Sequence, residues 1–249
     1  MAYFSGQGRV YLAQRDANGN PLDLHWVGNV PDLKITLNVE TIEHKESYSG
    51  QRLTDLQLIK AKDGEFSCTL EDFSVENLEL TLYGVTNTVT FGTVTGEVLP
   101  PVVTTGSTLL LAHQFVSNVT IKDATFKTLP AAQYTVLANQ GAIVFNDITT
   151  GGPYTQPFKV SYDYGAAKQV AMFRSAQPEV WLRFDGINTA DGNKPVIVDL
   201  YRVAINPTKD LSLISEDLQR FELSGRVLAD LTKSETGPLG QFGRLIVQG

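Results

Sequence analysis

The stretch "LKITLNVETIEHKESYSGQRLTDLQ", residues 33–57, contains a strong strand pattern and the point where that pattern stops. Apolar residues at the odd positions from Leu33 to Val39 alternate with polar ones, which predicts a strand with one buried and one solvated face. From His44 to Gln57 charges of both signs replace the alternation, with Gly50 in the middle. The sequence therefore predicts a polar loop between two strands.

Strand and helix signals continue on both sides of this loop. Upstream, "RVYLAQR" at residues 9–15 is followed by the turn-rich "DANGNP" and then by "LDLHWVG", which predicts a β-hairpin. Downstream, "GEFSCTLEDF" alternates again at residues 64–73. Ser74 can cap a short helix that Gly84 can end, and this is the clearest helix signal in the chain.

The middle of the chain has a different character from its two ends. Residues 85–106 are rich in Thr, Val, Gly and Pro, and five short strand candidates follow them up to residue 165. Long alternating strands then return in "EVWLRFDGIN", "VIVDLYRVAI" and "RFELSGRVLAD". We predict a mainly β protein: a β-sandwich with one short flanking helix, formed by residues 1–90 and 166–249, and a small β region inserted at residues 91–165.

Composition narrows the possible partners. The chain has 20 basic and 27 acidic residues, a net charge of −7 and a pI near 5.0, which disfavours a conventional nucleic-acid binder. The lone Cys68 cannot form an internal disulfide. There is no leader-like start and no apolar run of roughly the 20 residues that a bilayer span needs. We therefore expect a soluble cytoplasmic product without a membrane partner.

Motifs for catalysis or metal binding are absent or incomplete. His25, His44 and His113 have no second ligand at an established metal-binding spacing. "DANGN" begins like a calcium loop, but Pro21 stands where Gly is required and Val27 where a bidentate Glu belongs. No P-loop and no G-x-S-x-G occurs. We expect no catalytic residue, no metal and no cofactor, and a structural or binding role rather than an enzyme.

Residues 39–84 resemble a segment of the major tail tube proteins of long, flexible-tailed bacteriophages. In that family a strand leads into a charged E-x-x-E-S-x-S-G loop, then a second strand, then an acidic helix start with E-N-L. The residues that carry this pattern are Glu43, Glu46, Ser47, Ser49 and Gly50 in the loop and Asp72, Glu76, Asn77 and Leu78 at the helix. Residues 196–230 are similar to the family's closing segment, and residues 118–147 resemble an extra β segment that some members carry.

The resemblance implies a sandwich whose copies, six to a ring, join through a continuous inner β-barrel, with rings stacked into a hollow tube for the genome. We accordingly expect a structural virion protein of the bacteriophage tail, assembled in the host cytoplasm. Its expected partners are further copies of itself, the tape-measure, tail-tip and tail-terminator proteins, and double-stranded DNA that passes without specific binding. The acidic balance suits this role, because Lys and Arg facing the lumen would retain phosphates.

The resemblance also implies that the loop at residues 41–57 reaches a neighbouring subunit or ring. Its candidate interface residues are charges that can meet opposite charges, apolar anchors, a serine and a turn glycine: Glu43, Lys45, Glu46, Ser47, Tyr48, Gly50, Arg52, Leu53 and Asp55. Phe4, Phe242 and Leu245 lie near the two ends of the chain and are too apolar to be left in water, so we expect them to dock on a neighbour or on the fold. A solvated, flexible loop is the alternative for residues 41–57.

Two other functions fit parts of the pattern. A tube protein of a contractile tail or of a secretion machine would share the sandwich. A carbohydrate-binding or adhesin module would instead use exposed aromatic residues such as Trp26, Trp181 or Tyr201 against sugar rings.

Overall fold

The computed structural model describes residues 3–248 and divides the chain into two compact units. Unit 1 extends to Val85 and resumes at Val170, and unit 2 is Thr86–Gln169. The expected bounds of the inserted region, 91 and 165, lie a few residues inside those of unit 2. Residues 1, 2 and 249, at the outer ends of the expected sandwich, lie outside the described residues.

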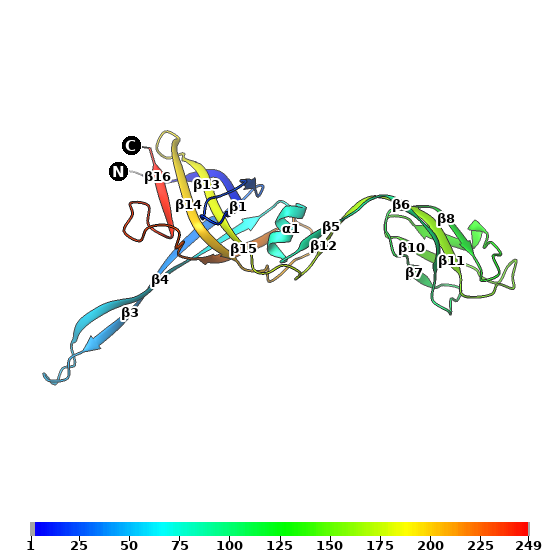
Figure 1. Ribbon diagram of the computed structural model, residues 1–249, viewed down its shortest axis with the longest axis horizontal. Coiled ribbons are helices and arrows are strands. Elements are labelled where there is room, and N and C mark those ends of the chain that lie inside the picture. Colours follow the sequence, from blue (N-terminus) through cyan, green and yellow to red (C-terminus); the bar gives the residue numbers. More distant parts are fainter. Residues whose placement is uncertain (1–2, 249) are drawn as a thin grey trace. The chain divides into compact units, whose positions relative to one another are not determined.

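Unit 1 is built from long antiparallel strands and one short helix (Figure 1). Its elements are β1 (Gly6–Gln14), β2 (His25–Trp26), β3 (Leu33–Lys45), β4 (Thr54–Leu70), α1 (Val75–Thr81), β13 (Glu179–Asn188), β14 (Lys194–Ile205), β15 (Phe221–Val227) and β16 (Gly243–Val247).

The strands of unit 1 form one hydrogen-bonded sheet in the order β2-β1-β13-β14-β15-β4-β3. One edge of β14 is shared between two partners, because β16 pairs along Val196–Leu200 and β15 along Val203–Ile205. The β3 strand lies at one end of the order, and no described strand pairs with its outer edge. The sheet therefore has an open edge along the whole length of β3.

The core of unit 1 lies on one face of this sheet. Val10 and Leu12 of β1 are buried there with Leu182, Ile205 and residues of β4 and β15. The predicted hairpin is confirmed, although β2 is only two residues long and pairs with Tyr11 and Leu12.

The predicted helix is present as α1, and its N-cap is the expected one. The Ser74 hydroxyl accepts a hydrogen bond from the Asn77 N–H at 3.4 Å, and Leu82 takes the C-cap position. The residue that turns the chain after the helix is Tyr83, with φ of +49°, rather than the expected Gly84. Tyr83 is held there because its hydroxyl donates to the Ile205 carbonyl at 2.6 Å.

Unit 2 has its own core and two three-stranded sheets, β7-β10-β9 and β6-β11-β8. All five short strands predicted in this region are present. The elements from the start of the insertion are β5 (Val85–Val89), β6 (Gly92–Val98), β7 (Thr108–Leu110), β8 (Val116–Lys122), the 3₁₀ turn η1 (Ala131–Gln133), β9 (Tyr134–Leu137), β10 (Ala142–Phe145), β11 (Lys159–Tyr164) and β12 (Ala167–Ala171). The β5 and β12 strands form a two-stranded sheet through which the chain enters and leaves the insertion.

The expected class, mainly β with one short α-helix, is confirmed for the part of the chain that the structure describes. Within residues 3–248, no helix has both the length and the apolar character needed to cross a bilayer.

Candidate assembly interface

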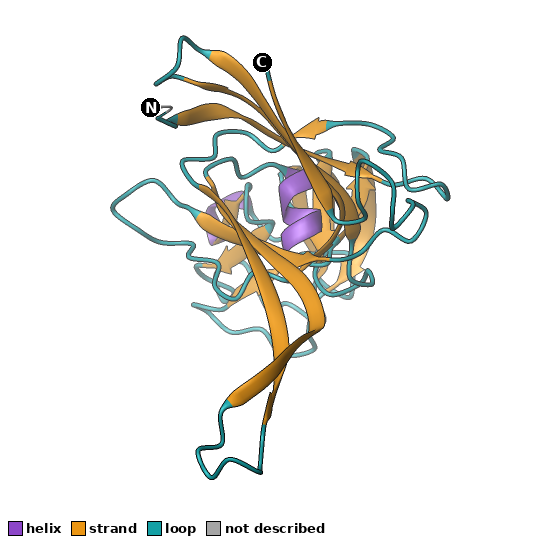
Figure 2. Ribbon diagram, turned by 90° about the vertical axis from the view of Figure 1, so that its left-hand side faces the viewer, coloured by secondary structure: helices purple, strands orange, loops and turns teal. Residues whose placement is uncertain are grey.

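A long hairpin projects from unit 1. We call residues 36–63, the outer part of the β3–β4 hairpin, the arm; all of them are exposed except Glu46. At about 3.3 Å per residue, the strand from Thr36 to Lys45 reaches roughly 30 Å. Figures 1 and 2 show the arm standing clear of the rest of unit 1.

The arm carries many large apolar side chains that contact solvent. Their exposed fractions lie between 49% and 87% for Leu37, Val39, Ile42, Tyr48, Leu53, Leu56, Leu58 and Ile59. The prediction that Leu37 and Val39 face a core within the subunit is therefore wrong. The hairpin has already left the body of unit 1 at that point, and only Leu33 and Ile35 pack on the core.

Apolar residues stand on both faces of the arm. Ile42 pairs with Leu58 and Thr41 pairs with Ile59, and a register shift that skips Lys60 lies next to the second pair. Directly opposed residues share a face and consecutive residues of a strand point to opposite faces. Ile42 and Leu58 thus lie on one face and Ile59 on the other, so a partner could cover either face or both.

The loop at the end of the arm is shorter than expected. Strand pairing continues to Lys45 on one side and resumes at Thr54 on the other, so only residues 46–53 form a loop, instead of residues 41–57. Polar residues of this stretch remain in the hydrogen-bonded strands because both faces of the arm are exposed. Neither face lies against a core, so the strands do not require an apolar residue at every second position. Glu43, for example, pairs with Gln57 in the ladder, while the register shift between His44 and Lys45 skips Asp55, whose Oδ1 lies 2.6 Å from His44 Nδ1.

The loop is organised by Glu46, whose side chain turns inward and is 4% exposed. Its carboxylate accepts hydrogen bonds from the Ser49 hydroxyl, from the N–H groups of Tyr48 (2.8 Å) and Ser49 (2.9 Å), and from the Leu53 N–H (3.2 Å). The Ser49 hydroxyl first, and then these N–H groups, lower the pKa of Glu46 to about 2, although burial opposes the shift. These bonds use the Glu46 oxygens within the loop, and the expectation that Glu46 meets a base of a neighbour stays a prediction.

The other predicted loop residues lie on the surface. Ser47 is exposed, Tyr48 is 87% and Leu53 56% exposed, and neither Lys45 nor Arg52 has an ion-pair partner within residues 3–248. Gly50 has φ of +80°, in the left-handed region that glycine tolerates, with open space around its α-carbon.

Glu43 is exposed on the arm and pairs across the ladder with Gln57. Apart from Glu46, the predicted interface residues of the loop are thus displayed together at one end of the arm.

The first and last strands, β1 and β16, belong to the same sheet of unit 1, on either side of β13 and β14 (Figure 1). Phe242 packs on the core of its own subunit, whereas Phe4 and Leu245 are 66% and 64% exposed and line one cleft of about 640 Å³. Leu245 belongs to β16, which is anchored where Arg244 Nε donates to the fully buried Asp199 carboxylate at 2.8 Å. The apolar C-terminal stretch therefore docks on its own fold as a strand.

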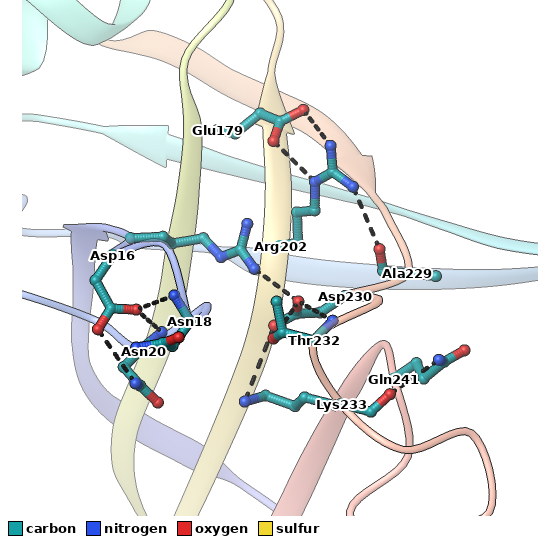
Figure 3. Close-up of polar contacts among 11 residues, drawn as sticks. Asp16, Asn18, Asn20, Glu179, Arg202, Ala229, Asp230, Thr232, Lys233 and Gln241 are labelled. Carbon is teal, nitrogen blue, oxygen red and sulfur yellow. Dashed lines mark hydrogen bonds and ion pairs between the residues drawn. The ribbon is translucent and has the colours of Figure 1, made fainter.

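A buried ion pair that the sequence analysis missed holds the first hairpin to the chain segment before β16 (Figure 3). Arg15 and Asp230 are 2.9 Å apart and are 13% and 2% exposed in their side chains. Burial opposes ionisation of Asp230, but hydrogen bonds from Thr232 and Arg15 outweigh it and lower the pKa of Asp230. The two residues are more than 200 positions apart, so no local pattern could have paired them.

Nearby polar contacts fix the same region. Arg202 of β14 binds Glu179 of β13 through two hydrogen bonds of 2.8 Å (Figure 3). Asp16 accepts hydrogen bonds from the N–H groups of Asn18 (2.9 Å) and Asn20 (2.7 Å), so "DANGN" forms the hairpin turn that was preferred over a calcium loop. The carboxylates in this part of the fold serve structural roles.

The aromatic residues considered for sugar binding are mostly inaccessible. Trp181 is 7% and Tyr201 1% exposed, and Lys233 lies above both rings at 5.4 and 5.0 Å. Only Trp26 is substantially exposed, at 49%, with the Arg9 guanidinium 5.3 Å from its ring centre. Two of the three candidates therefore cannot stack on a ligand from solvent.

Comparison with protein families gives a match over most of the chain. The model of a family described as "Protein of unknown function UCP028589" matches residues 3–246. No curated protein matches the chain.

Proposed function

The chain belongs to this family of unknown function, and we propose that it is the structural subunit of a bacteriophage tail tube. In this proposal its copies form hexameric rings, and the rings stack into a hollow conduit for genome delivery. The observation that carries the proposal is the arm: a hairpin of roughly 30 Å whose apolar residues are exposed on both faces. The resemblance of residues 39–84 to tail tube proteins gives that observation its context.

The exposed apolar side chains of the arm support the proposal that a permanent partner covers them. Monomeric proteins rarely expose large contiguous apolar surfaces, and burying one Leu or Ile side chain contributes about 1.5–3 kcal/mol. Two faces with apolar residues suit a position between neighbours, where each face contacts a different copy. A flexible solvated loop would need no such residues and no carboxylate that orders its backbone as Glu46 does.

The sheet of unit 1 supports ring closure through strands. The open edge of β3 offers N–H and C=O groups to another strand, and β2 covers only two residues of β1 at the other end of the order. The two halves of the sheet, β1-β13-β14 and β15-β4-β3, would act as the layers of the sandwich. Joining β3 of one copy to β1 of the next would link the sheets of neighbouring copies into a continuous sheet around the ring, which is the inner barrel of this proposal.

The acidic balance supports the proposed conduit role. A net charge of −7 per subunit gives DNA little reason to bind the wall, since adhesion would depend on Lys and Arg releasing counterions from phosphates. The protein would then belong to the virion tail and be assembled in the host cytoplasm. Its further partners would be the tape-measure, tail-tip and tail-terminator proteins.

Assembly of the purified protein tests this function. Sedimentation velocity over a range of protein concentrations, followed by electron microscopy of the fast-sedimenting fraction, should reveal hollow tubes of constant diameter. A protein that stays monomeric at high concentration, even with tail-initiating proteins added, would refute the proposal.

A further inference from the structure

A pocket of about 310 Å³ in unit 1 gathers three cationic side chains. They are Arg183 of β13, Lys233 of the segment before β16, and Arg244 of β16, and the described lining contains no Asp or Glu. We call it the basic pocket. Arg183 follows the core residue Leu182 in β13, so the pocket lies on the face of the sheet that is turned away from the core.

The two arginines of the basic pocket share one buried carboxylate. Asp199 of β14 stands opposite Arg183 on one side of the ladder and opposite Arg244 on the other. Its Oδ2 accepts a hydrogen bond from Arg244 Nε at 2.8 Å, and its Oδ1 accepts one from Arg183 Nη1 at 3.4 Å. The side chain of Asp199 is fully buried, whereas those of Arg183 and Arg244 are 29% and 35% exposed. One positive charge is therefore left on the exposed side.

Lys233 also shares its carboxylate with a second cation. Its Nζ lies 3.9 Å from Oδ2 of Asp230, while Oδ1 of Asp230 lies 2.9 Å from Arg15 (Figure 3). The Asp230 side chain is only 2% exposed. Four cations thus meet two buried carboxylates around the pocket, which leaves an excess of two positive charges.

Other acids on the surrounding segments do not enter the pocket. Four of them lie on these segments and none is in the lining: Asp16, Asp23, Asp185 and Glu235. Asp185 stands opposite Arg9 in the ladder, and the Asp16 carboxylate is held by N–H groups of its own turn. The excess of positive charge therefore belongs to the recess itself.

The basic pocket has hydrogen-bond donors that the protein does not use. Among the described residues, no acceptor is bound by either Nη atom of Arg244 or by Nζ of Lys233. A guanidinium fork binds two oxygens of a phosphate group, and an ammonium adds a point charge. Leu24 and Leu239 complete the lining, and apolar walls strengthen the attraction between charges. A doubly charged oxyanion matches the excess charge better than a singly charged carboxylate does.

We propose that the basic pocket binds one phosphate group, as inorganic phosphate or as a phosphate monoester, through Arg183, Lys233 and Arg244. These residues come from β13, from the segment before β16 and from β16. The bound anion bridges the three segments and holds the last strand on the sheet. The site lies within one subunit, so it does not depend on the proposed assembly.

Calorimetric titration of the protein with inorganic phosphate at constant ionic strength tests this site. We expect saturable binding of one anion with a dissociation constant of about 1 mM or tighter, and no saturable binding of acetate. Glycerol phosphate, titrated in parallel, identifies the source: tighter binding of the ester indicates a monoester, and tighter binding of the free ion indicates phosphate. No saturable binding of either compound, or equal binding of acetate, would overturn the proposal.

Variants of the pocket assign the binding to its residues. Lys233→Gln and Arg183→Gln should each weaken phosphate binding roughly tenfold or more. Each leaves the buried carboxylate one cationic partner, Arg15 for Asp230 and Arg244 for Asp199, which favours a folded variant. Lys233→Arg keeps the charge and should bind within a few-fold of the parent. Lys209→Gln, at an exposed position of unit 1 outside the pocket, is the matched control. Unchanged binding by both glutamine variants would overturn the assignment.

Thermal unfolding separates binding from the general effect of phosphate on proteins. Phosphate stabilises folded proteins by exclusion from their surface, and this effect is common to the parent and its variants. At about 10 mM phosphate, the Tm of the parent should rise by roughly 3–6 °C more than that of Lys233→Gln. Tm values in chloride show whether each variant is folded. Equal rises in the parent and in a folded Lys233→Gln variant would overturn the site.

NMR places the bound anion. The Trp181 indole N–H points to Asp199 at 3.4 Å and the ring lines the basic pocket, whereas Trp26 lies outside it. During a phosphate titration, the Trp181 indole resonance should shift with the calorimetric midpoint and the Trp26 resonance should not. A shift of Trp26 alone, or of neither, would overturn the placement.

Discussion

Glu46 and Leu53 close the end of the arm by a reciprocal pair of hydrogen bonds. The Glu46 N–H donates to the Leu53 carbonyl at 2.9 Å, and the Leu53 N–H donates to the Glu46 carboxylate at 3.2 Å. One acid thereby fixes both sides of an eight-residue loop that is otherwise surrounded by water. The loop is an ordered surface, which lowers the entropic cost of binding a partner.

The order of this loop should depend on pH in a defined direction. The folded pKa of Glu46, about 2, lies below its ordinary value of 4.5, so the ionised carboxylate stabilises the loop at pH values above about 4.5. This contribution is lost as the pH falls toward about 2. Amide chemical shifts of Tyr48 and Ser49, followed by NMR, should titrate with a midpoint near 2. A midpoint near 4.5 would contradict the assignment, and Glu46→Gln should abolish the transition.

The apolar residues of the arm should matter for assembly and not for folding. Ile42→Ser with Leu58→Ser removes a cross-strand pair that is 53% and 54% exposed. We expect the free energy of unfolding of the monomer to change by less than about 1 kcal/mol, because neither side chain lies in the core, while tubes are lost. Urea denaturation and electron microscopy measure the two effects. Leu218→Ser, at an 88% exposed position away from the arm, is the control and should keep its tubes.

The Arg15–Asp230 pair should stabilise unit 1 strongly. Asp230→Ala leaves a largely buried guanidinium without its partner, which costs roughly 3–5 kcal/mol in comparable sites. Urea denaturation at neutral pH measures the loss. Asp191→Ala breaks the exposed pair with Lys194 and should cost less than about 1 kcal/mol. Equal effects of the two variants would contradict the structural role given to Asp230.

Unit 2 should fold without unit 1. Its core contains its own fully buried aromatic residues, among them Phe145, Phe158 and Tyr162, and both of its three-stranded sheets contribute to it. A protein made of residues 86–169 should give a dispersed amide spectrum and a cooperative thermal transition. A disordered spectrum would show that the insertion depends on the rest of the chain.

The sequence predicted the strands well because their alternation is local. The β1 hairpin, the Ser74 cap and the five short strands of the insertion all follow from neighbouring residues. The alternation of apolar and polar residues did not show where β3 leaves the body of unit 1. Leu37 and Val39, which are exposed in the arm, follow the same alternating pattern as Leu33 and Ile35, which pack on the core. Burial depends on which other strand lies opposite, and that is a property of the whole chain.

The sequence indicated which residues the end of the arm displays, and not the geometry of its loop; that these residues form an interface stays a prediction. Lys45, Tyr48, Arg52 and Leu53 lie on the surface of the tip, but the inward turn of Glu46 required knowledge of four hydrogen bonds. Glu46 lies three residues before Ser49 and seven before Leu53, and this spacing matches no established sequence motif for an ordered loop.

Negative-stain electron microscopy of the concentrated protein beside a variant with residues 47–53 replaced by a short Gly-Ser linker tests the central claim most directly. The strands of the arm remain in this variant, and only its tip is lost. We predict hollow tubes from the parent and only rings or monomers from the variant. Globular monomers from the parent at every concentration, with tail-initiating proteins present, would contradict the tube role itself.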